Sequence, residues 1–270
     1  MALIGCRQKS LPVERMADAR RRALEINPDN AAAERSVPRT PAGRQGGTPR
    51  IAVVTARKWP RSGARLSVSF MDSPRQGLRT RILLHMNAWG EEANVVFSET
   101  EGTGEVRIAR LDSPADMAGY WSYIGTEILD IDTGEPTLNL EGFTMRTSER
   151  EFRRVVRHEA GHTLGFEHEH MRGDIVKRID REKAIKYFDR SDGWTPQEVE
   201  EQVLTPLAKR SLMGTTESDP LSIMCYQLPA SIMKDRKAVP GGMDINPHDS
   251  AFAATIYPKA ARRRPTAKRR

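Results

Sequence analysis

Four of the six histidines in this 270-residue sequence lie within one short stretch, RHEAGHTLGFEHEHMR, at residues 157–172. His158 and His162 are four residues apart, a spacing that on a helix places both imidazoles on one face, one turn apart. Two ring nitrogens placed in this way can bind the same metal ion. Zinc suits them because it binds neutral imidazole and imposes no coordination geometry of its own. The spacing therefore predicts a zinc site.

A third ligand follows from the glycine in the same stretch. Gly165 comes three residues after His162, and glycine readily adopts the left-handed conformation that ends a helix. The chain can then turn back and bring His168 to the same ion. Three histidine ligands leave one coordination position for water, which is typical of catalytic rather than structural zinc sites.

Glu159 follows His158 directly, so on a helix its side chain points about 100° away from that ligand. Zinc lowers the pKa of a bound water from about 15.7 to about 7. A carboxylate near that water can accept its proton and later pass it to a leaving amine, which makes Glu159 the candidate general base. Two solvated histidines on a surface helix are the alternative, which the full H-E-x-x-H-x-x-G-x-x-H pattern disfavours.

One helix must carry the first two histidines, and the residues before them predict it. Ser148 is a candidate N-cap, and Glu151 stands at the position that completes a capping box. The apolar face of this helix, expected over residues 148–166, consists of Phe152, Val155, Val156 and Ala160. The sequence thus predicts a buried helix that ends at the metal.

The elements before this helix alternate between strands and a helix. Apolar patterning and turn signals predict strands over residues 65–72, 94–100, 104–110, 119–131 and 135–142. Further helices are predicted over residues 13–26, 73–93, 195–204 and 245–258. The fold class is therefore α+β, with the strands in the N-terminal part.

Charge is distributed unevenly along the chain. The net charge is +9 over residues 1–65, −8 over residues 66–259 and +6 over residues 260–270. We expect residues 1–50 to be a basic, flexible extension and residues 260–270 a basic, disordered tail. The domain between them, 51–259, divides into an upper part up to about residue 165 and a lower part over residues 166–259.

Targeting signals are weak. No run of eighteen apolar residues occurs, so we expect no membrane span. The apolar run at the N-terminus is too short for a secretory signal peptide. The two cysteines, Cys6 and Cys225, permit at most one intrachain bridge and exclude a disulfide framework.

The extended histidine motif resembles that of the metzincin zinc endopeptidases, and the segment GFEHEH resembles the corresponding segment of the astacin branch. The segment LSIMCYQ at residues 221–227 is similar to the methionine-containing turn of that family. The resemblance extends from about Arg57 to Pro258 and includes Asp219, just before the turn. It implies a twisted mixed five-stranded sheet with an active-site helix, followed by a mostly helical and irregular C-terminal part.

The resemblance also implies roles for further residues. Met224 would form the hydrophobic base under the metal, and Tyr226 would ligate zinc at rest and then support the oxyanion. Gly165 and Glu169 would support the site. Substrate would lie antiparallel along an edge formed by Ser122, Tyr123, Ile124 and Gly125, through main-chain hydrogen bonds.

Several residues depart from the astacin pattern. Cys225 stands where a histidine is common, and is either a small buried filler or an oxidation-sensitive thiol. The family's inhibitory aspartate motif is not found in residues 1–50, where Cys6 is a possible thiolate cap for zinc. Because a long extension precedes the domain, we expect Arg172 to pair with Glu169 in place of a freed N-terminus.

These observations predict a monomeric zinc endopeptidase with one zinc ion per chain and a protein or peptide as substrate. The family suggests secretion, and the lack of a signal peptide suggests the cytoplasm. One alternative is a zinc-stabilised protein whose basic ends bind nucleic acid or an anionic surface, although we do not expect nucleic acid to be the main partner. Another is a zinc amidase with a non-protein substrate.

Overall fold

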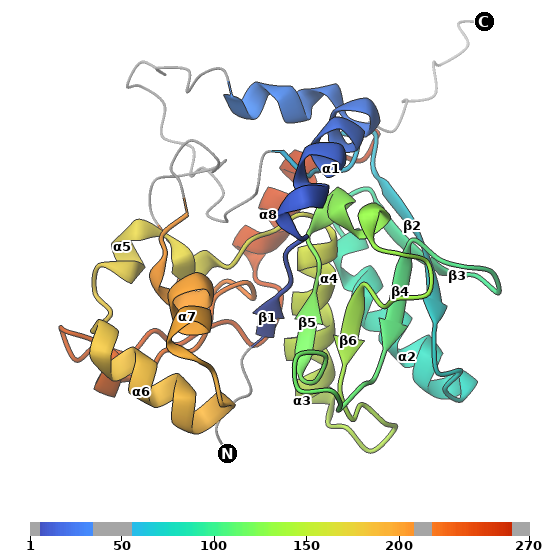
Figure 1. The fold of residues 1–270 in the computed structure, drawn as a ribbon. Helices are drawn as coiled ribbons and strands as arrows, with labels where there is room; N and C mark the ends of the chain where they lie inside the picture. Colours follow the sequence, from blue (N-terminus) through green and yellow to red (C-terminus); the bar gives the residue numbers. More distant parts are fainter. Residues whose placement is uncertain (1–5, 35–55, 208–217, 261–270) are drawn as a thin grey trace, which may run out of the picture.

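The computed structural model describes residues 6–34, 56–207 and 218–260. Six strands form one sheet in the order β1-β5-β6-β4-β2-β3, as Figure 1 shows. The strands are β1 (Cys6–Gln8), β2 (Ala64–Phe70), β3 (Val95–Glu99), β4 (Val106–Ala109), β5 (Tyr120–Ser122) and β6 (Leu138–Leu140). The sheet is mixed, because β5 and β6 pair antiparallel while all the other neighbours run parallel.

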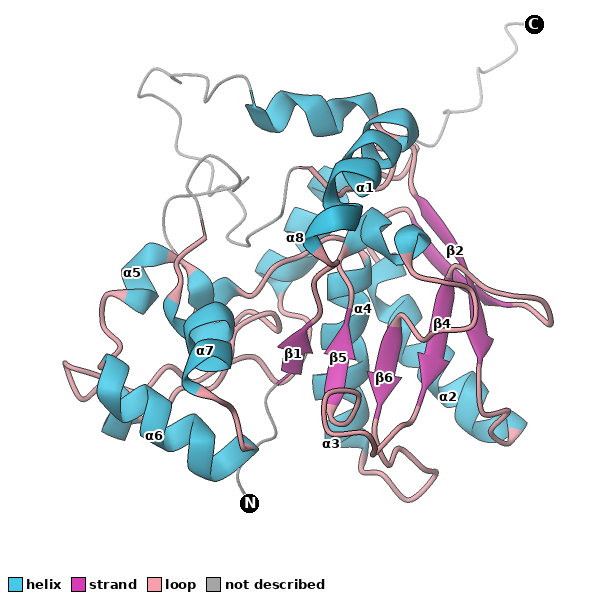
Figure 2. Cartoon of the chain, viewed as in Figure 1, coloured by secondary structure: helices cyan, strands magenta, loops and turns pink. Residues whose placement is uncertain are grey.

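Helices cover one face of this sheet and build the part of the molecule beside β1 (Figure 2). The helices before residue 165 are α1 (Val13–Ile26), η1 (Pro28–Glu34), α2 (Gln76–Met86), η2 (Asn87–Gly90), η3 (Gly125–Asp130), α3 (Glu149–Glu151), η4 (Phe152–Val156) and α4 (Arg157–Thr163). Those that follow are η5 (Glu169–Met171), α5 (Gly173–Val176), α6 (Arg181–Asp192), α7 (Pro196–Val199), η6 (Glu200–Leu204), η8 (Ala230–Ile232) and α8 (Pro247–Ile256). The α+β class is confirmed.

Two hydrophobic cores meet near the end of α4. The larger core lies between the sheet and the helices behind it, and includes Ile82, Ile108, Phe152 and Met224. The smaller core lies in the lower part, and includes Phe188, Trp194 and Tyr226. The histidine-rich stretch therefore lies where the two parts of the domain join.

The sixth strand corrects two expectations about the N-terminus. Residues 6–34 were predicted to belong to a flexible extension, but Cys6–Gln8 adds a strand to the predicted five-stranded sheet. The helix predicted over residues 13–26 is confirmed as α1, and it packs on η3. These contacts bury apolar side chains such as Leu11 and Ala19, which offsets the entropy lost on ordering. Residues 35–50 and 261–270 lie outside the described residues, so the domain limits at 50 and 260 stay predictions.

The strand predicted over residues 119–131 is shorter than expected. It ends at Ser122, and a helical turn, η3, begins at Gly125. Gly125 has φ +51, and a Cβ at this position would lie 2.0 Å from the carbonyl oxygen of Arg57. Only glycine fits this conformation and this close backbone approach, so the chain leaves the strand direction here.

His85 is a buried histidine outside the metal motif, and it is 1% exposed. Its ring packs on that of Phe152, with 5.3 Å between the ring centroids. The reason is that His85 lies on the buried side of α2, facing the helix that carries the metal motif.

Candidate metal centre and active site

The two helical histidines are delivered by one continuous helical run, α3–η4–α4. It begins as predicted at Ser148, whose hydroxyl accepts a hydrogen bond from the backbone N–H of Glu151 at 3.2 Å. Phe152, Val155 and Val156 bury its apolar face against the larger core. His158 and His162 follow on this helix and are both buried.

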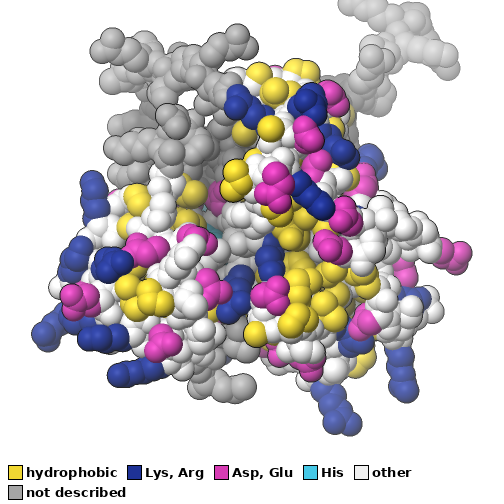
Figure 3. Space-filling view, viewed as in Figure 1, with side chains coloured by type: hydrophobic (Ala, Val, Ile, Leu, Met, Phe, Trp, Pro, Cys, Tyr) yellow, Lys and Arg dark blue, Asp and Glu magenta, His cyan; other side chains and the backbone are white. Residues whose placement is uncertain are grey.

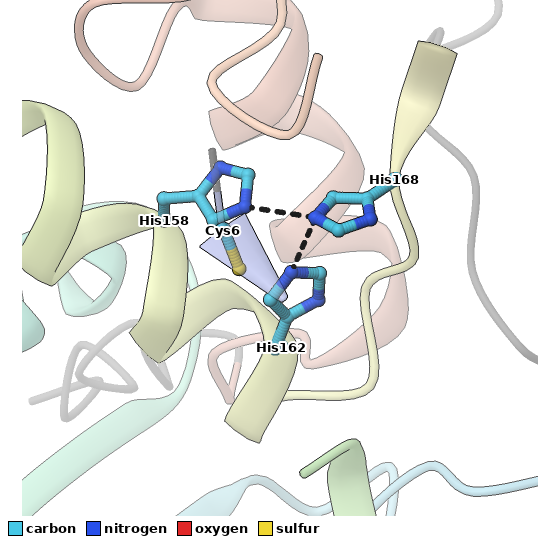
Figure 4. Close-up of side chains that lie close together, drawn as sticks. All are labelled: Cys6, His158, His162 and His168. Carbon is cyan, nitrogen blue, oxygen red and sulfur yellow. Dashed lines mark hydrogen bonds between the residues drawn. The ribbon is translucent and has the colours of Figure 1, made fainter. Parts of the chain in front are cut away.

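The turn after α4 brings the third histidine to the other two. Gly165 has φ +93, and its N–H donates to the carbonyl oxygen of His162 at 2.8 Å. The N–H of Phe166 donates to the carbonyl of Gly161 at 3.0 Å, so the helix closes and the chain reverses. The Nε2 atom of His168 then lies 3.2 Å from that of His158 and 2.9 Å from that of His162 (Figure 4).

Hydrogen bonds on the far side of two rings fix which nitrogens face inward as acceptors. His158 Nδ1 lies 2.6 Å from the carbonyl oxygen of Ile223, and His162 Nδ1 lies 2.7 Å from that of Phe166. A carbonyl only accepts, so each Nδ1 carries the hydrogen and each Nε2 presents a lone pair. Burial supports this state, because it lowers the pKa of His158 to about 4 and depresses that of His162 and His168.

Converging lone pairs repel one another unless a cation lies between them. Two nitrogens bound at about 2.0–2.1 Å to one tetrahedral zinc are roughly 3.3 Å apart, close to the 2.9 and 3.2 Å observed here. His158, His162 and His168 thus fit a zinc ion in both distance and protonation state. The structure thus brings together the three residues that the sequence predicted as ligands.

The methionine turn lies directly under the metal-binding helix. Met224 is fully buried, and its sulfur lies 2.5 Å from the position that a Cβ on Gly161 would take. The backbone carbonyl of Met224 accepts a hydrogen bond from the N–H of Glu169 at 2.8 Å. Met224 therefore ties the turn to the returning chain and packs against the helix that carries His158 and His162.

Asp249 holds this turn and was not singled out from the sequence. Its carboxylate accepts hydrogen bonds from the Ser222 hydroxyl at 2.6 Å and from the Ile223 N–H at 2.9 Å. It is also the third residue of α8, where it completes a capping box with Asn246. Because the Ile223 carbonyl in turn contacts the His158 ring, Asp249 positions this candidate ligand through one intermediate residue. The capping-box spacing in NPHD was the available signal.

Glu159 lies beside the metal ligands and is 1% exposed. Burial raises the pKa of its carboxyl to about 8, although Cys6 and Arg154 oppose this shift. Its Oε2 accepts a hydrogen bond from the Cys6 thiol at 3.2 Å, and its Oε1 has no hydrogen-bond partner among the described residues. A nearby divalent cation favours the ionised carboxylate, which is the form that can accept a proton.

Tyr226 packs against His168 and His170 and lines the same cavity as Glu159. Its ring stacks on His170, with 4.0 Å between centroids and 18° between planes, and lies 4.5 Å from the ring of His168. The hydroxyl is buried and has no hydrogen-bond partner among the described residues. A buried, unpaired phenol is costly, so this group is available for a ligand or substrate.

Two further predicted positions have clear roles. Glu169 pairs with Arg172, as expected from the sequence, and its Oε1 also accepts a hydrogen bond from the N–H of Asp219 at 2.9 Å. Cys225 is 3% exposed and belongs to the smaller core. This surrounding matches the interpretation of Cys225 as a buried filler.

Only part of the predicted substrate edge, residues 122–125, lies on a strand in the structure. Ser122 lies at the end of β5, where its carbonyl oxygen accepts a hydrogen bond from the N–H of Lys9 at 3.0 Å. The N–H of Tyr123 instead donates toward the β6 side, to the carbonyl of Thr137. Ile124 and Gly125 are buried and lead into η3. The outer edge is thus formed by β5, and in this structure β1 is paired with it.

Cys6, a possible zinc cap in the sequence, lies beside the three histidines in the structure. Its sulfur and one ring nitrogen from each of the three metal-site histidines lie within 4.8 Å of one another. Figure 4 shows the Cys6 side chain reaching from β1 toward the point where the rings converge. A cysteine in an otherwise basic N-terminal segment was a weak signal, because nothing local linked it to a motif about 150 residues away.

Comparisons with known proteins agree with this geometry. The sequence profile of the Astacin family, a family of peptidases, matches residues 52–230. A curated protein, "Zinc metalloproteinase nas-27" of Caenorhabditis elegans, is 33% identical over 96 residues, which are 36% of this chain. The chain aligns with only 19% of the length of that relative.

Solved structures match over most of the chain. One described as "Structure of myroilysin" is 29% identical, has a TM-score of 0.71, and covers 78% of this chain and 100% of its own. Another, "Crystal structure of myroilysin", is 26% identical with a TM-score of 0.57, and covers 83% of this chain and 98% of its own.

Proposed function

The chain belongs to the astacin family of zinc metallopeptidases, and from this premise we propose that it is an endopeptidase in which Glu159 is the general base. The observation that carries the proposal is the convergence of three histidine Nε2 atoms beside a buried carboxylate. Three neutral ligands leave a coordination position for water or substrate.

When bound, zinc would supply a Lewis acid that lowers the pKa of water and polarises a carbonyl. The protein's own groups do the rest. Glu159 accepts the proton of the attacking water and passes it to the leaving nitrogen, which is general base and then general acid catalysis. Tyr226 donates its hydroxyl hydrogen to the oxygen on which negative charge develops.

We propose that the outer edge of β5 binds the substrate backbone in antiparallel pairing, at Ser122 and the residues before it. Main-chain hydrogen bonds to this edge would give affinity without strong dependence on substrate sequence. Beside this edge lies a cavity of about 60 Å³ next to Glu159. Arg154, Tyr187 and Asp192 contribute polar groups to its lining, which would contact a substrate side chain.

A protein or peptide substrate follows from the peptidase family. Within the described residues, no helix is long and apolar enough to cross a membrane. Secretion, which the family suggests, and a monomeric state are parts of this proposal, and solution scattering together with cell fractionation would test them.

The described surface between the basic ends gives no support to the binding-protein alternative. On the face drawn in Figure 3, Lys and Arg side chains are interspersed with Asp and Glu. Where basic side chains project from α6, they alternate with Glu182, Asp189 and Asp192 on the same helix. Binding to a nucleic-acid backbone requires clustered positive charge. The catalytic type of ligand set also disfavours a purely structural zinc, and peptidase family membership disfavours the zinc amidase.

Replacing Glu159 with Gln tests the proposal. We expect the rate of casein hydrolysis to fall by several orders of magnitude while zinc stays at one ion per chain, because Gln cannot accept the proton. The measurement is made in the wild-type chain and in the Cys6→Ser chain, since Cys6 contacts Glu159. Glu182→Gln is the matched control, because Glu182 is exposed on α6. Hydrolysis that persists in Glu159→Gln would remove this residue from the mechanism.

A further inference from the structure

Three basic side chains lie in a row on α6, in the lower part of the domain. Lys183, Lys186 and Arg190 are exposed, and their spacing of three and four residues places them on one side of the helix. Glu182 and Asp189 each directly precede one member of the row, so they project about 100° away from it around the helix. One face of α6 is therefore positively charged, although acidic residues occur elsewhere on the same helix.

A groove of about 480 Å³ between α6 and η8 is lined by this row. The exposed Ser231 of η8 also lines it. Lys183 pairs with Asp180, with 3.0 Å between Nζ and Oδ2. Lys186 and Arg190, in contrast, form no ion pair with the residues that the structure describes. The groove thus has two positive charges that no carboxylate of the described chain compensates.

Tyr187 connects this groove to the candidate active site, because it lines both the groove and the cavity beside Glu159. Tyr120, the first residue of β5, lines the same cavity. A substrate that pairs antiparallel with β5 has its C-terminal end at Tyr120. The substrate residues after the scissile bond therefore lead past Tyr120 toward Tyr187 and the groove.

We infer that the groove along Lys183, Lys186 and Arg190 is a second substrate-binding surface, which takes acidic side chains of the polypeptide several residues after the scissile bond. The inference rests on the proposed peptidase function and adds a substrate class to it. Lys offers a carboxylate a mobile point charge, and Arg offers it two parallel N–H groups. Three cations flanked by Glu182 and Asp189 fit a short acidic segment better than the continuous charge of a nucleic acid.

The groove adds selectivity rather than strong affinity, because contacts between exposed charges are weak. A single exposed ion pair changes affinity by a few-fold at most, so several must act together. Salt screening limits such contacts to about 10 Å at 0.1 M ionic strength. Acidic substrate residues that reach the groove should therefore be bound. Those before the scissile bond, which lie toward the Ser122 end of β5, should not.

The first test locates a bound peptide on the full chain and does not require hydrolysis. The probe is a peptide of four consecutive Glu residues that carries a photoreactive benzophenone group, and mass spectrometry maps the crosslinked residues. We expect crosslinks on α6 or η8, and about tenfold fewer there when Gln replaces Glu in the peptide. The wild-type chain suffices, so the result does not depend on whether a variant folds. Crosslinks found only outside α6 and η8, for example on the basic ends, overturn the inference.

The second test compares the hydrolysis of two peptides that differ only in having Glu or Gln residues after the scissile bond. We expect kcat/KM to be about tenfold higher for the Glu peptide, because several exposed ion pairs act together. The ratio should fall to about one when Lys183→Gln, Lys186→Gln and Arg190→Gln are combined. Moving the Glu residues to the other side of the scissile bond should also abolish the preference. The chains are the wild type and Cys6→Ser, as for Glu159→Gln.

The control variant combines Arg65→Gln, Arg75→Gln and Arg146→Gln, which remove the same charge at exposed positions outside the groove. This variant should keep the wild-type ratio. A wild-type ratio of about one, or an equal fall of the ratio in both variants, overturns the inference. If no chain cleaves either peptide or casein, the peptidase proposal fails, while the crosslinks still decide whether the groove binds an acidic peptide.

Discussion

The carboxylate of Glu169 and the guanidinium of Arg172 form an ion pair enclosed by protein, with Nε 2.7 Å from Oε1 and side chains 0% and 2% exposed. Glu169 follows the proposed metal ligand His168 directly, and its carboxylate accepts a hydrogen bond from the backbone N–H of Asp219. The pair therefore joins the end of the metal motif to the chain that leads into the methionine turn. The negative charge of Glu169 is thus neutralised by Arg172, three residues further along the chain.

Arg172→Ala tests how far the domain depends on this pair. Removing one partner leaves a buried charge on Glu169, so we expect the free energy of unfolding to fall by about 3–5 kcal/mol. Urea denaturation measures it. Arg178→Ala is the control, because Arg178 and its partner Asp235 are each about one-third exposed and such pairs contribute about 0–1 kcal/mol. An equal loss of unfolding free energy in both variants would show that the enclosed pair contributes no more to stability than an exposed pair.

Tyr226→Phe removes the hydroxyl that we assign to the developing oxyanion. We expect kcat to fall by about 10²–10³ with little change in KM, as for other single oxyanion donors. Tyr257→Phe is the control, since its hydroxyl donates to the carbonyl of Leu164 at 2.6 Å and lies in the core. That variant should lose about 1 kcal/mol of stability and keep its kcat. A Tyr226→Phe enzyme with wild-type kcat would contradict the role. Both variants are assayed in the Cys6→Ser chain.

Asp249→Ala should weaken zinc binding without removing a ligand. Asp249 holds the Ile223 backbone, which accepts the hydrogen bond of His158. Loss of such an outer contact lowers metal affinity by about 10–100-fold, which competition with a chelator measures. Asp235→Ala, at an exposed position, provides the comparison. Unchanged affinity in Asp249→Ala would mean that the turn keeps its shape without this carboxylate.

Glu127 predicts a pH dependence of stability. Burial raises the pKa of its carboxyl to about 7, although the adjacent Arg57 opposes the shift. The folded chain thus binds this proton more tightly than the unfolded chain, whose carboxyl has its ordinary pKa of 4.5. This contribution is fully present below the unfolded pKa and is lost as pH rises through about 7, at about 1.4 kcal/mol per pH unit.

Glu127→Gln should remove that part of the pH dependence. The measurement is the difference in unfolding free energy between pH 5 and pH 8 for the variant and for wild type. Comparing slopes rather than absolute stabilities allows for the loss of the Arg57 partner. Glu182→Gln, at an exposed site, should keep the wild-type slope. If Glu127→Gln keeps it too, the buried carboxyl does not titrate in this range.

Local sequence determined the metal motif and the helix that carries it. The spacing of His158, His162 and His168 requires only helical periodicity and one glycine that ends the helix, and both act within a dozen residues. The cap at Ser148, the methionine turn and the Glu169–Arg172 pair also depend on residues close together in the sequence, or are recognisable as short sequence motifs. For the same reason most strand and helix positions were predicted correctly, including α1.

Only the tertiary structure showed which residues, distant in the sequence, contact these motifs. The contact between Cys6 and Glu159 joins positions 153 residues apart, and no periodicity in the sequence encodes such a pairing. The early end of β5 depends on the approach of Arg57 to Gly125, and the burial of His85 depends on the packing of Phe152. Sequence patterns record which face of an element is apolar, whereas the partner of that face is selected by packing across the whole chain.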